Sequence, residues 1–510
     1  MRLYDLTLYD IINRNARLYP DQTAWLDADD NQALTFGQYL EAVDRMAPQL
    51  AAAGVVNGDR IAVIGKNCLP YCVLYGAAAA LGAIVVPVNW RLSAVEMAYI
   101  LNDSGARVVL ADNDAPELIA TVQSELAAPT PFYNLQPLQG PYAELPDAPL
   151  PGNARPRVDV ATDDGLVIIY TAAVAGRPRG ALLSHGNLLC ASIQVMYLLG
   201  LTSADVHLNP LPLFHIAGLC MAFSSFHAAA LNVTMSKFDA AQAARLVAEH
   251  RVSLMFTFSP ILQQLLAQVG QGGDDISSLR VVLGIDTPET IESYQKATGG
   301  SFFALFGQTE TTMLATMSRY DEQPKSAGRP IPLVDIQLMD DNDQPVPSGQ
   351  SGEIAVRGPM VFKGYWGLAA DNAHTFRNGW HHTGDLGRFD DDGFLWYAGR
   401  KPEKELIKPG GENVYPVEVE TAILEHPAVA SVVVFGVPDP KWKEGIKAVC
   451  TLKPGQSVSE KELIAFVGGR IARYKKPQYI EFVASLPRNK GVIDREAVKA
   501  RYGGTQTRSV

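Results

Sequence analysis

Cysteine is scarce in this chain of 510 residues, and the scarcity excludes two kinds of structural support. The five cysteines form no CxxC pair, and an odd number cannot pair completely. A disulfide framework and a cysteine-based zinc site are therefore excluded as expectations, and we expect buried thiols in a reducing compartment. This pattern predicts a cytoplasmic protein. The cysteines are Cys68, Cys72, Cys190, Cys220 and Cys450.

Basic residues are also in short supply. The chain has 43 lysines and arginines against 54 aspartates and glutamates, and its formal net charge is −11. No general basic face is expected, so the composition argues against nucleic acid or a membrane surface as a partner. If this acidic protein binds an anion, a local cluster of arginine and lysine must hold it.

Long apolar runs are nearly absent. The first residues carry charges throughout and lack the apolar stretch that is typical of a signal peptide. Only Tyr71–Trp90 suggests a membrane span, but it contains Pro87 and two glycines, and its apolar part changes from alanine-rich to Ile84-Val85-Val86. A buried helix followed by a buried strand explains this run better, so we do not expect an integral membrane protein.

Alternating helix and strand patterns are what the chain does contain, up to about residue 320. They predict parallel sheets covered by helices. Beyond that point, short alternating segments such as Gly352–Val356 lie between turn signals and predict an antiparallel β subdomain. The charged stretch after Arg400 is typical of a linker. The remaining residues, with a strand at Ser431–Phe435 and a helix at Glu460–Ala472, suit a small α+β domain.

The stretch Val167–His185 is the first candidate for a binding function. Four apolar residues predict a buried strand end, and a tight loop follows in which Gly176 and Gly180 bracket Arg177 and Arg179. Such a loop can wrap a polyphosphate, because backbone N–H groups face the anion and arginines neutralise it. An ordinary strand-turn-helix link with two solvated arginines explains the same residues, and this stretch alone does not decide between them.

Further motifs along the chain favour the phosphate-binding interpretation of this stretch. With the loop at Tyr170–Gly180, they occur in the order that is found in the adenylate-forming superfamily, which includes acyl-CoA synthetases, adenylation domains and luciferases. The chain resembles this superfamily over nearly its whole length. The motifs are PLFHIAG (Pro212–Gly218), FGQTE (Phe306–Glu310), GEIAVRGPMVFKGYW (Gly352–Trp366), WHHTGDLGRFDDDGFLWYAGR (Trp380–Arg400), GGENVYPVEVE (Gly410–Glu420), GVPDPKWKE (Gly436–Glu444) and YKKP (Tyr474–Pro477).

The resemblance implies a reaction and a domain organisation. A carboxylate attacks the α-phosphate of ATP in the presence of Mg²⁺ and displaces pyrophosphate to give acyl-AMP. The thiol of CoA then attacks the acyl carbon and displaces AMP. It implies an α/β fold with a large N-terminal domain of helix-covered sheets and a distorted β subdomain, followed by a small, mobile α+β C-terminal domain. We expect the boundaries at residues 1–399, a hinge at 400–405, and residues 406–510.

The resemblance also implies roles for nucleotide-binding residues. Asp385 matches the carboxylate that accepts hydrogen bonds from both ribose hydroxyls, and Arg400 matches the arginine that contacts ribose and phosphate. Glu310 matches the Mg²⁺-binding glutamate, Thr309 would touch phosphate, and Phe306 with the adjoining Gly307 would lie near the adenine. A solvated turn aspartate and a helix-terminal glutamate are the alternatives for Asp385 and Glu310.

Roles on the acyl and CoA side follow in the same way. His215 matches the residue that gates the acyl pocket, although a lone histidine beside a phenylalanine is also common in ordinary cores. Gly410 and Gly411 match the loop that lines the pantetheine tunnel, where a side chain would block the thiol. Lys404 and Lys408 could add positive charge for the phosphates of CoA, and a solvated linker explains them equally well.

Three departures from the superfamily pattern matter. The phosphate loop lacks the usual hydroxyls, which leaves Thr171, Gly176, the backbone amides and the arginines to hold phosphate, with Arg179 in place of the usual lysine. A catalytic lysine is expected where Val492 stands, so only the neighbouring Lys490 could replace it. Without a replacement, adenylation would lose about 10²–10³ in rate.

The third departure concerns the acyl pocket. Ile285 and Asp286 occupy a segment that usually reads Gly-Gly-Ala-Pro, so we expect a short or reshaped pocket.

The GGENVYP motif and the lack of an appended carrier domain favour free CoA as the acceptor. A nucleotide- or acyl-binding regulatory protein with weak adenylation remains the alternative. The sequence leaves open whether the protein is a homodimer.

Overall fold

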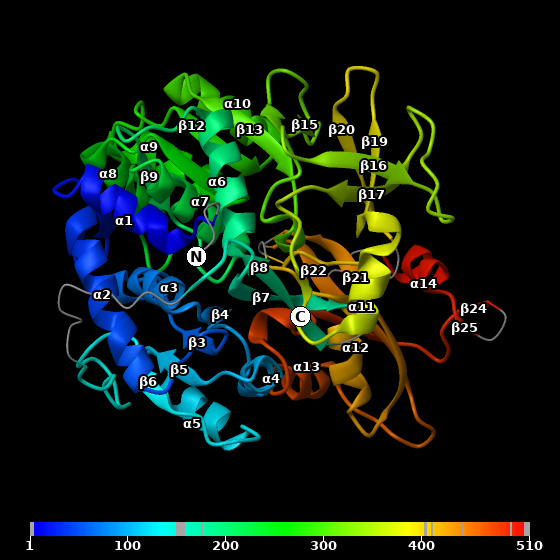
Figure 1. Ribbon diagram of the computed structural model, residues 1–510. Coiled ribbons are helices and arrows are strands. Elements are labelled where there is room, and N and C mark those ends of the chain that lie inside the picture. The colour runs from blue at the N-terminus through cyan, green and yellow to red at the C-terminus, as the bar shows by residue number, and fades with distance from the viewer. Residues whose placement is uncertain are drawn as a thin grey trace.

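The computed structural model describes residues 5–148, 159–174, 177–401, 405–409, 412–440, 442–489 and 492–503. Within them the fold class predicted from the sequence is confirmed: a large mixed α/β domain is followed by a smaller C-terminal domain (Figure 1). Five residues that the sequence singles out lie outside the described residues: Gly176, Lys404, Gly410, Gly411 and Lys490.

Two sheets form the frame of the large domain. The first has the strand order β15-β14-β13-β12-β11-β9-β10-β1-β2 and the second β18-β8-β7-β4-β3-β5-β6. Pairing is parallel in the interior of both sheets. It is antiparallel at both ends of the first sheet and at the β18-β8-β7 end of the second, whereas β5 and β6 at the other end pair in parallel. This is the arrangement expected from alternating helices and strands, because each crossover helix returns the chain to the same end of the sheet.

The strands of the first sheet are β1 (Thr23–Asp27), β2 (Ala33–Thr35), β9 (Val206–Asn209), β10 (Leu231–Thr234), β11 (Leu254–Phe258), β12 (Val281–Ile285), β13 (Ser301–Phe306), β14 (Thr316–Arg319) and β15 (Arg329–Pro330). Those of the second are β3 (Arg60–Ile64), β4 (Ile84–Val88), β5 (Val108–Ala111), β6 (Phe132–Asn134), β7 (Gly165–Val174), β8 (Arg177–Ser184) and β18 (Gly364–Tyr365).

Helices pack on these sheets, and the apolar run at Tyr71–Trp90 is one helix and one strand of this frame. Helix α3 (Leu69–Leu81) ends at Gly82 in the left-handed conformation, and β4 follows with all its residues buried. None of the helices in the described part of the chain is long and apolar enough to cross a membrane. The other helices of the large domain are α1 (Leu8–Leu18), α2 (Phe36–Ala52), α4 (Ala94–Ser104), α5 (Pro116–Ser124), α6 (His185–Leu199), α7 (Ile216–His227), α8 (Ala240–His250), α9 (Ile261–Gly272), α10 (Pro288–Thr298) and α11 (Ala369–Thr375).

A buried aromatic cluster fixes helix α7, which begins directly after His215. The ring of Phe226 lies 5.1 Å from that of Phe36, 5.2 Å from that of Tyr39 and 5.9 Å from that of Trp25, centroid to centroid. All four side chains are at most 2% exposed. Truncation of such a buried ring costs about 3–5 kcal/mol of stability, so this cluster holds the helix that carries His215 at its start.

The antiparallel β subdomain is confirmed as the sheet β16-β17-β19-β20, with β16 (Asp335–Met339), β17 (Gly352–Arg357), β19 (His381–Phe389) and β20 (Leu395–Arg400). The small domain follows it, and its described residues form the sheet β21-β22-β23, a separate pair β24-β25 and the α-helices α12, α13 and α14. Their bounds are β21 (Val429–Asp439), β22 (Lys443–Leu452), β23 (Tyr479–Phe482), β24 (Arg488–Asn489), β25 (Val492–Ile493), α12 (Pro416–Leu424), α13 (Glu460–Gly468) and α14 (Arg495–Tyr502).

Two expectations from the sequence were wrong in detail. The helix expected over Glu460–Ala472 ends at Gly468, since two consecutive glycines have a low helix propensity. Arg177 and Arg179 do not lie in a loop: β7 and β8 form an antiparallel hairpin, and both arginines belong to strand β8. The apolar residues on the two sides of the small-residue segment form paired strands. The order of residues along the chain does not show this pairing.

Candidate active site

The site begins at the carboxyl ends of three neighbouring parallel strands, β11, β12 and β13. Ligands of open α/β sheets commonly bind at such an edge. Directly after β13 the chain turns through Gly307, where a Cβ atom would lie only 1.8 Å from the carbonyl oxygen of Met313. Glycine is therefore required for the close approach of two backbone segments, and it leads Thr309 and Glu310 into a short 3₁₀ turn (Thr309–Thr311).

Asp385 lies on β19 and is only 1% exposed. Its Oδ1 accepts a hydrogen bond of 2.9 Å from the Tyr397 hydroxyl and lies 3.0 Å from Nε of Arg400, while Oδ2 contacts the side-chain amide of Gln308. The alternative of a solvated turn aspartate is thus wrong. A buried carboxylate with this many donors is held in a fixed position as a hydrogen-bond acceptor.

Arg400, the last residue of β20, links this carboxylate to the small domain. Its Nη1 donates a 3.2 Å hydrogen bond to the hydroxyl of Tyr415, which immediately precedes helix α12. Burial alone would lower the pKa of Arg400, but the carboxylate of Asp385, with Tyr415 and Tyr397, raises it. The guanidinium therefore stays charged at the junction between the two domains.

Glu310 is buried, with 8% of its surface exposed, and its Oε1 accepts a 2.9 Å hydrogen bond from the Tyr365 hydroxyl. Tyr365 also contacts Arg179: the guanidinium carbon lies 3.9 Å from the ring centroid, and Nη2 donates to the hydroxyl at 3.2 Å. Burial, followed by the charge of Glu310, raises the pKa of Tyr365, so this hydroxyl remains a donor. Arg179, Tyr365 and Glu310 thus form one connected chain from strand β8 to the 3₁₀ turn.

The remaining residues of the β7–β8 hairpin differ in exposure. Arg179 is further held by Asp371, whose Oδ2 lies 3.0 Å from Nη1, and only 13% of its side chain is exposed. Arg177 is exposed and lies beside the ring of Tyr99 at 5.9 Å. The hydroxyl of Thr171 donates to the backbone carbonyl of Arg179 at 3.4 Å. Of the two arginines of this hairpin, Arg177 is therefore the one whose guanidinium is open to solvent.

An aromatic pair lies beside Asp385. The ring of Phe306, 8% exposed at the end of β13, is 6.2 Å from the ring of Tyr397, centroid to centroid. The hydroxyl of Tyr397 bonds Asp385, and burial raises the pKa of this hydroxyl to about 12. The carboxylate expected to hold a ribose therefore has flat apolar surface next to it.

His215 lies at the N-terminus of α7, where its side chain makes no capping hydrogen bond. The side chain remains 45% exposed, and its Nε2 is 3.8 Å from Oε2 of Glu412 in the small domain. Surrounding protein, with a smaller effect from Arg91, lowers the pKa of His215 to about 4, so the ring is neutral at pH 7. Glu412 also contacts the guanidinium of Arg91. A satisfied core histidine, the alternative for this residue, is not what the structure shows.

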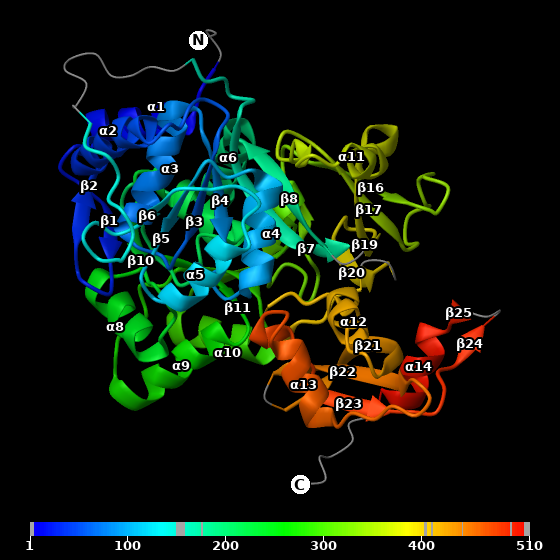
Figure 2. The same cartoon turned by 90° about the horizontal axis from the view of Figure 1, so that it is seen from below.

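One face of the small domain thus meets the large domain at the site. Glu412 and Tyr415 lie on it, as does Lys408, whose pKa is lowered by burial and by the charge of Arg400. Strands β24 and β25, which flank residues 490 and 491, lie at the outer edge of the small domain in both views, away from the β7–β8 hairpin (Figures 1 and 2).

Sequence reasoning missed five residues that the structure brings to the site. Each belongs to a motif that the sequence does display, so the signal was present at the level of the motif. The pairing of each with a particular partner depends on the approach of distant segments and could not be read from the motif. The residues are Gln308, Tyr365, Tyr397, Glu412 and Tyr415.

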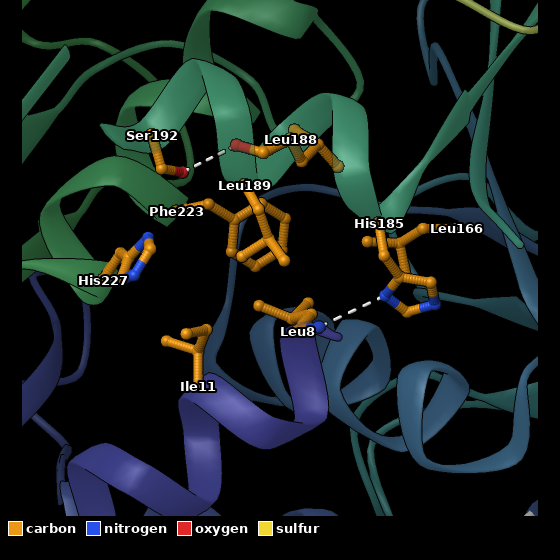
Figure 3. Close-up of a pocket in the computed structure, with 9 residues that line it drawn as sticks. All are labelled: Leu8, Ile11, Leu166, His185, Leu188, Leu189, Ser192, Phe223 and His227. Atoms are coloured by element: carbon orange, nitrogen blue, oxygen red, sulfur yellow. Dashed lines mark hydrogen bonds between the residues drawn. The ribbon is translucent and has the colours of Figure 1, made fainter. Parts of the chain in front are cut away.

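A small internal cavity lies apart from these residues, between α1, α6 and α7 (Figure 3). His185 lines it, with Nδ1 accepting a 3.2 Å hydrogen bond from the backbone N–H of Leu8. The other lining residues are mostly apolar. The cavity therefore belongs to the core and not to the candidate site.

Comparison with known proteins agrees with this geometry. A family model described as "AMP-binding enzyme" matches residues 12–366, and one described as "AMP-binding enzyme C-terminal domain" matches residues 418–491. A feruloyl-CoA synthase from Amycolatopsis sp. is 35% identical over 497 residues, which cover 96% of this chain and 98% of the relative. The long-chain-fatty-acid–CoA ligase FadD13 of Mycobacterium tuberculosis is 30% identical, with 97% and 98% covered.

Solved structures give the same result. A putative long-chain-fatty-acid CoA ligase from Rhodopseudomonas palustris is 45% identical, with a TM-score of 0.74, over 78% of this chain and 100% of that one. An o-succinylbenzoate CoA synthetase from Bacillus subtilis is 30% identical, with a TM-score of 0.84, over 97% and 98% of the two chains.

The fold and the site therefore define an adenylate-forming enzyme, and the chain belongs to the AMP-binding enzyme family. Within this family it is an acyl-CoA synthetase, an AMP-forming acid–thiol ligase that uses ATP and CoA. The reading as a binding or regulatory protein with weak adenylation is the less supported of the two.

Proposed function

We propose that the protein activates a compact carboxylic acid as acyl-AMP and transfers the acyl group to free CoA at the junction of its two domains. The observation that carries this proposal is the buried Asp385–Arg400 pair, which the Tyr415 hydroxyl joins to the small domain. A ribose needs a fixed ionised acceptor, and a phosphate needs a fixed cation. This pair offers both at one place.

Asp385 would accept hydrogen bonds from the two ribose hydroxyls, and the nucleotide would displace the donor that Gln308 now supplies. Phe306 and Tyr397 offer aromatic surface for the adenine, with Gly307 allowing the close backbone approach. Thr309 would donate to phosphate, and its position at the start of the 3₁₀ turn next to Glu310 supports this role. Arg400 would contact ribose and phosphate from the opposite side.

Mg²⁺ fits this site as an ion that is carried by the nucleotide. No group of three or more metal-ligating side chains occurs in the described residues, and Glu310 supplies a single buried carboxylate. Mg²⁺ commonly binds through one or two carboxylates together with substrate phosphates and water, so this donor set suits it. The ion would neutralise charge on the phosphates, while the Tyr365 hydroxyl orients the Glu310 carboxylate that would bind it.

Pyrophosphate would be held at the β7–β8 hairpin by backbone amides, Thr171, Gly176 and the arginines. Arg177 is exposed and could contact phosphate directly, whereas Arg179 is engaged with Tyr365 and Asp371. We therefore assign the larger role to Arg179, because its guanidinium is fixed next to the Tyr365–Glu310 chain. The exposed Arg177 would add a weak contact to phosphate that solvent screens.

The thioester half-reaction would use the opposite side of the junction. The neutral imidazole of His215 borders the path to the acyl group, and Glu412 faces it from the small domain at 3.8 Å. Gly410 and Gly411 precede Glu412 in the sequence and would line the pantetheine tunnel. Lys408 would add positive charge for the phosphates of CoA.

Domain motion would connect the two half-reactions. We propose that residues 1–399 and 406–510 are the two bodies and that residues 400–405 are the hinge. Lys490 would approach the phosphates only after the small domain rotates, because strands β24 and β25 lie away from the β7–β8 hairpin in the present orientation. It would then replace the lysine that Val492 does not supply.

A short acyl pocket is proposed on the basis of Ile285. This side chain is 51% exposed at the carboxyl end of β12 and pairs in register with Phe258 of β11. Its volume would occupy space that glycine leaves free. Asp286 follows it, and burial raises the pKa of this carboxyl. Compact acids should therefore be better substrates than long-chain acids.

The experiment is pyrophosphate and acyl-CoA formation on a panel of short, aromatic and long-chain acids, with native protein and two variants. Asp385→Asn should lower kcat/KM for ATP about 10²–10³-fold, because one fixed charged acceptor is lost. Asp335→Asn, on the exposed Asp335–Arg357 pair of the same sheet, is the matched control and should change it less than about twofold. ATP binding without any turnover would favour the binding protein, and a preference for long-chain acids would contradict the short pocket.

A cytoplasmic homodimer is the state that we propose for the protein. The scarcity and burial of cysteine support a reducing compartment. Ile193 and Tyr197 support self-association, because they lie one turn apart on α6 and are 50% and 75% exposed. Sedimentation velocity at micromolar concentration would test this state, and a purely monomeric boundary would contradict it.

A further inference from the structure

A buried lysine of the small domain bridges the two domains at some distance in sequence from every residue assigned above. Nζ of Lys475 lies 2.7 Å from Oε1 of Glu96 on helix α4 of the large domain and 2.5 Å from Oε2 of Glu418 on helix α12 of the small domain. The Lys475 side chain is 4% exposed, and those of Glu96 and Glu418 are 12% and 6% exposed. In a contact this well shielded from water, the removal of one charged partner costs more than it does in an ordinary surface ion pair.

Two further hydrogen bonds cross the same boundary. Oε2 of Glu96 accepts the backbone N–H of Ala472 at 2.9 Å, and the hydroxyl of Ser93 donates to the backbone carbonyl of Arg470 at 3.1 Å. Ser93 and Glu96 are the N-cap and the third residue of α4, so the docking surface is the capped start of a helix. The segment from Arg470 to Lys475 therefore binds one short, well-ordered feature of the large domain.

Glu96 and Lys475 each keep a hydrogen-bond partner within their own domain when the contact between the domains is broken. Glu96 completes a capping box with Ser93, because its Oε2 also accepts from the Ser93 backbone N–H at 2.8 Å and its own backbone N–H donates to the Ser93 hydroxyl oxygen at 3.4 Å. Lys475 keeps Glu418 as a partner within its own domain. Separation of the domains would leave neither a lone buried cation nor an uncapped helix, so the contact can open at a moderate cost.

We propose that Ser93, Glu96, Lys475 and Glu418 form a reversible latch that positions the small domain for the thioester half-reaction and opens for adenylation. This inference rests on the proposed function for the two half-reactions, but the latch itself is a statement about domain position. In the latched orientation Glu412 and Tyr415 face the site, whereas strands β24 and β25 lie at the outer edge of the small domain.

Glu96 and Lys475 are positioning residues in this scheme, since they act through the placement of the small domain and contact no substrate. Burial alone would lower the pKa of Lys475, and Glu418, Tyr474 and Glu96 together raise it. The cation is therefore retained over the whole working pH range. The latch responds to competing contacts and to domain rotation, and not to a change of protonation.

The test is Glu96→Gln, because glutamine preserves the capping box of α4 while removing the charge that Lys475 binds. Glu462→Gln is the matched control: Glu462 completes an identical capping box with Ser459 on α13, but it is exposed and lies within the small domain.

Pulsed EPR distances between spin labels at Glu117→Cys and Arg501→Cys report the domain position in a Cys190→Ser background. Both half-reactions are measured separately, adenylation by pyrophosphate release and thioester formation from supplied acyl-AMP and CoA.

Glu96→Gln should broaden the distance distribution toward undocked positions and slow thioester formation about tenfold, with adenylation unchanged or faster. Glu462→Gln should match the native protein in all three measurements. A native distance distribution in Glu96→Gln would overturn the latch, and so would an equal loss in both half-reactions. If the native protein forms no acyl-AMP, the proposed function fails, but the EPR distances still decide whether the latch exists.

Discussion

Arg177 and Arg179 are separated by one proline on strand β8, yet their side chains have different surroundings. Arg177 is exposed, whereas Arg179 is enclosed by the Tyr365 ring and the Asp371 carboxylate. Since Tyr365 donates to Glu310, the loss of Arg179 would disturb the carboxylate that is assigned to Mg²⁺. Arg179 should therefore contribute more than Arg177 to kcat/KM for ATP.

The first prediction compares Arg179→Ala with Arg177→Ala. Arg179→Ala should lower kcat/KM for ATP about 10–100-fold, because it removes a charge-assisted bond and leaves Tyr365 and Asp371 without their partner. Arg177→Ala should lower it less than about threefold, since water can replace an exposed guanidinium. Initial rates of pyrophosphate release at varied ATP would measure both effects. Equal and negligible effects would contradict a role for this hairpin in phosphate handling.

Individual site residues were predictable from the sequence only where a motif carries them. Asp385, Glu310 and Arg400 were assigned from motifs, and the structure gathers Asp385 and Arg400 into one ion pair. The hydroxyl of Tyr365 could not be predicted as the partner of Glu310, because the two residues come from separate segments that meet only in the folded chain. Motifs identify residue types, whereas partners depend on tertiary approach.

Secondary-structure elements were predictable where a local signal decides them. Thr7, Thr35 and Ser459 all cap helices through capping boxes, and such boxes can be seen in the sequence. The β7–β8 hairpin was not recognised as a hairpin, because its turn offers no pattern such as Asn-Gly and its strands read as separate apolar runs. Local chemistry marks the ends of helices more clearly than it marks strand pairing.

The pair β24–β25 carries the second prediction. Lys490 lies between these strands in the sequence and is the candidate for the lysine that Val492 does not supply. Lys490→Ala should slow acyl-AMP formation about 10²–10³-fold, because a donor to developing charge is lost. Thioester formation from supplied acyl-AMP should remain unchanged, since it uses the opposite face of the small domain. Single-turnover assays of each half-reaction would measure the two rates.

Lys453→Ala is the control for this prediction, because Lys453 is exposed in the same domain after strand β22. It should leave both rates unchanged. If Lys490→Ala also leaves acyl-AMP formation unchanged, Lys490 is not the replacement lysine, and adenylation in this protein must proceed without a lysine from this hairpin.

At the scale of the whole molecule, the two-domain organisation was predictable and the position of the small domain was not. The two-domain organisation follows from the length of the chain, the alternation of helix and strand, and the charged linker near Arg400. The position of the small domain depends on a few contacts across the boundary, such as Lys475 with Glu96 and Glu412 with His215. These contacts join residues that no local pattern connects.

The large domain should lose stability as the pH falls from neutral toward 4. His185 and His207 are both 0% exposed, and burial lowers the pKa of each from 6.5 to about 4. Between these values the unfolded chain binds protons that the folded chain excludes, so unfolding becomes easier with every added proton. The stabilisation is complete above pH 6.5 and is lost as the pH falls through this window. Each histidine should contribute about 1 kcal/mol to the loss between pH 7 and 5.5.

Urea unfolding midpoints at pH 7 and pH 5.5 measure this loss. His207→Gln should show a smaller midpoint shift than the native protein, because one buried titrating ring has been removed, whatever its effect on stability at pH 7. His374→Gln is the control, since His374 is exposed on helix α11 and should leave the native shift unchanged. If His207→Gln keeps the full native shift, His207 is protonated in the folded state at pH 5.5. The pH dependence would then have to arise from other histidines whose pKa burial lowers, such as His185 and His227.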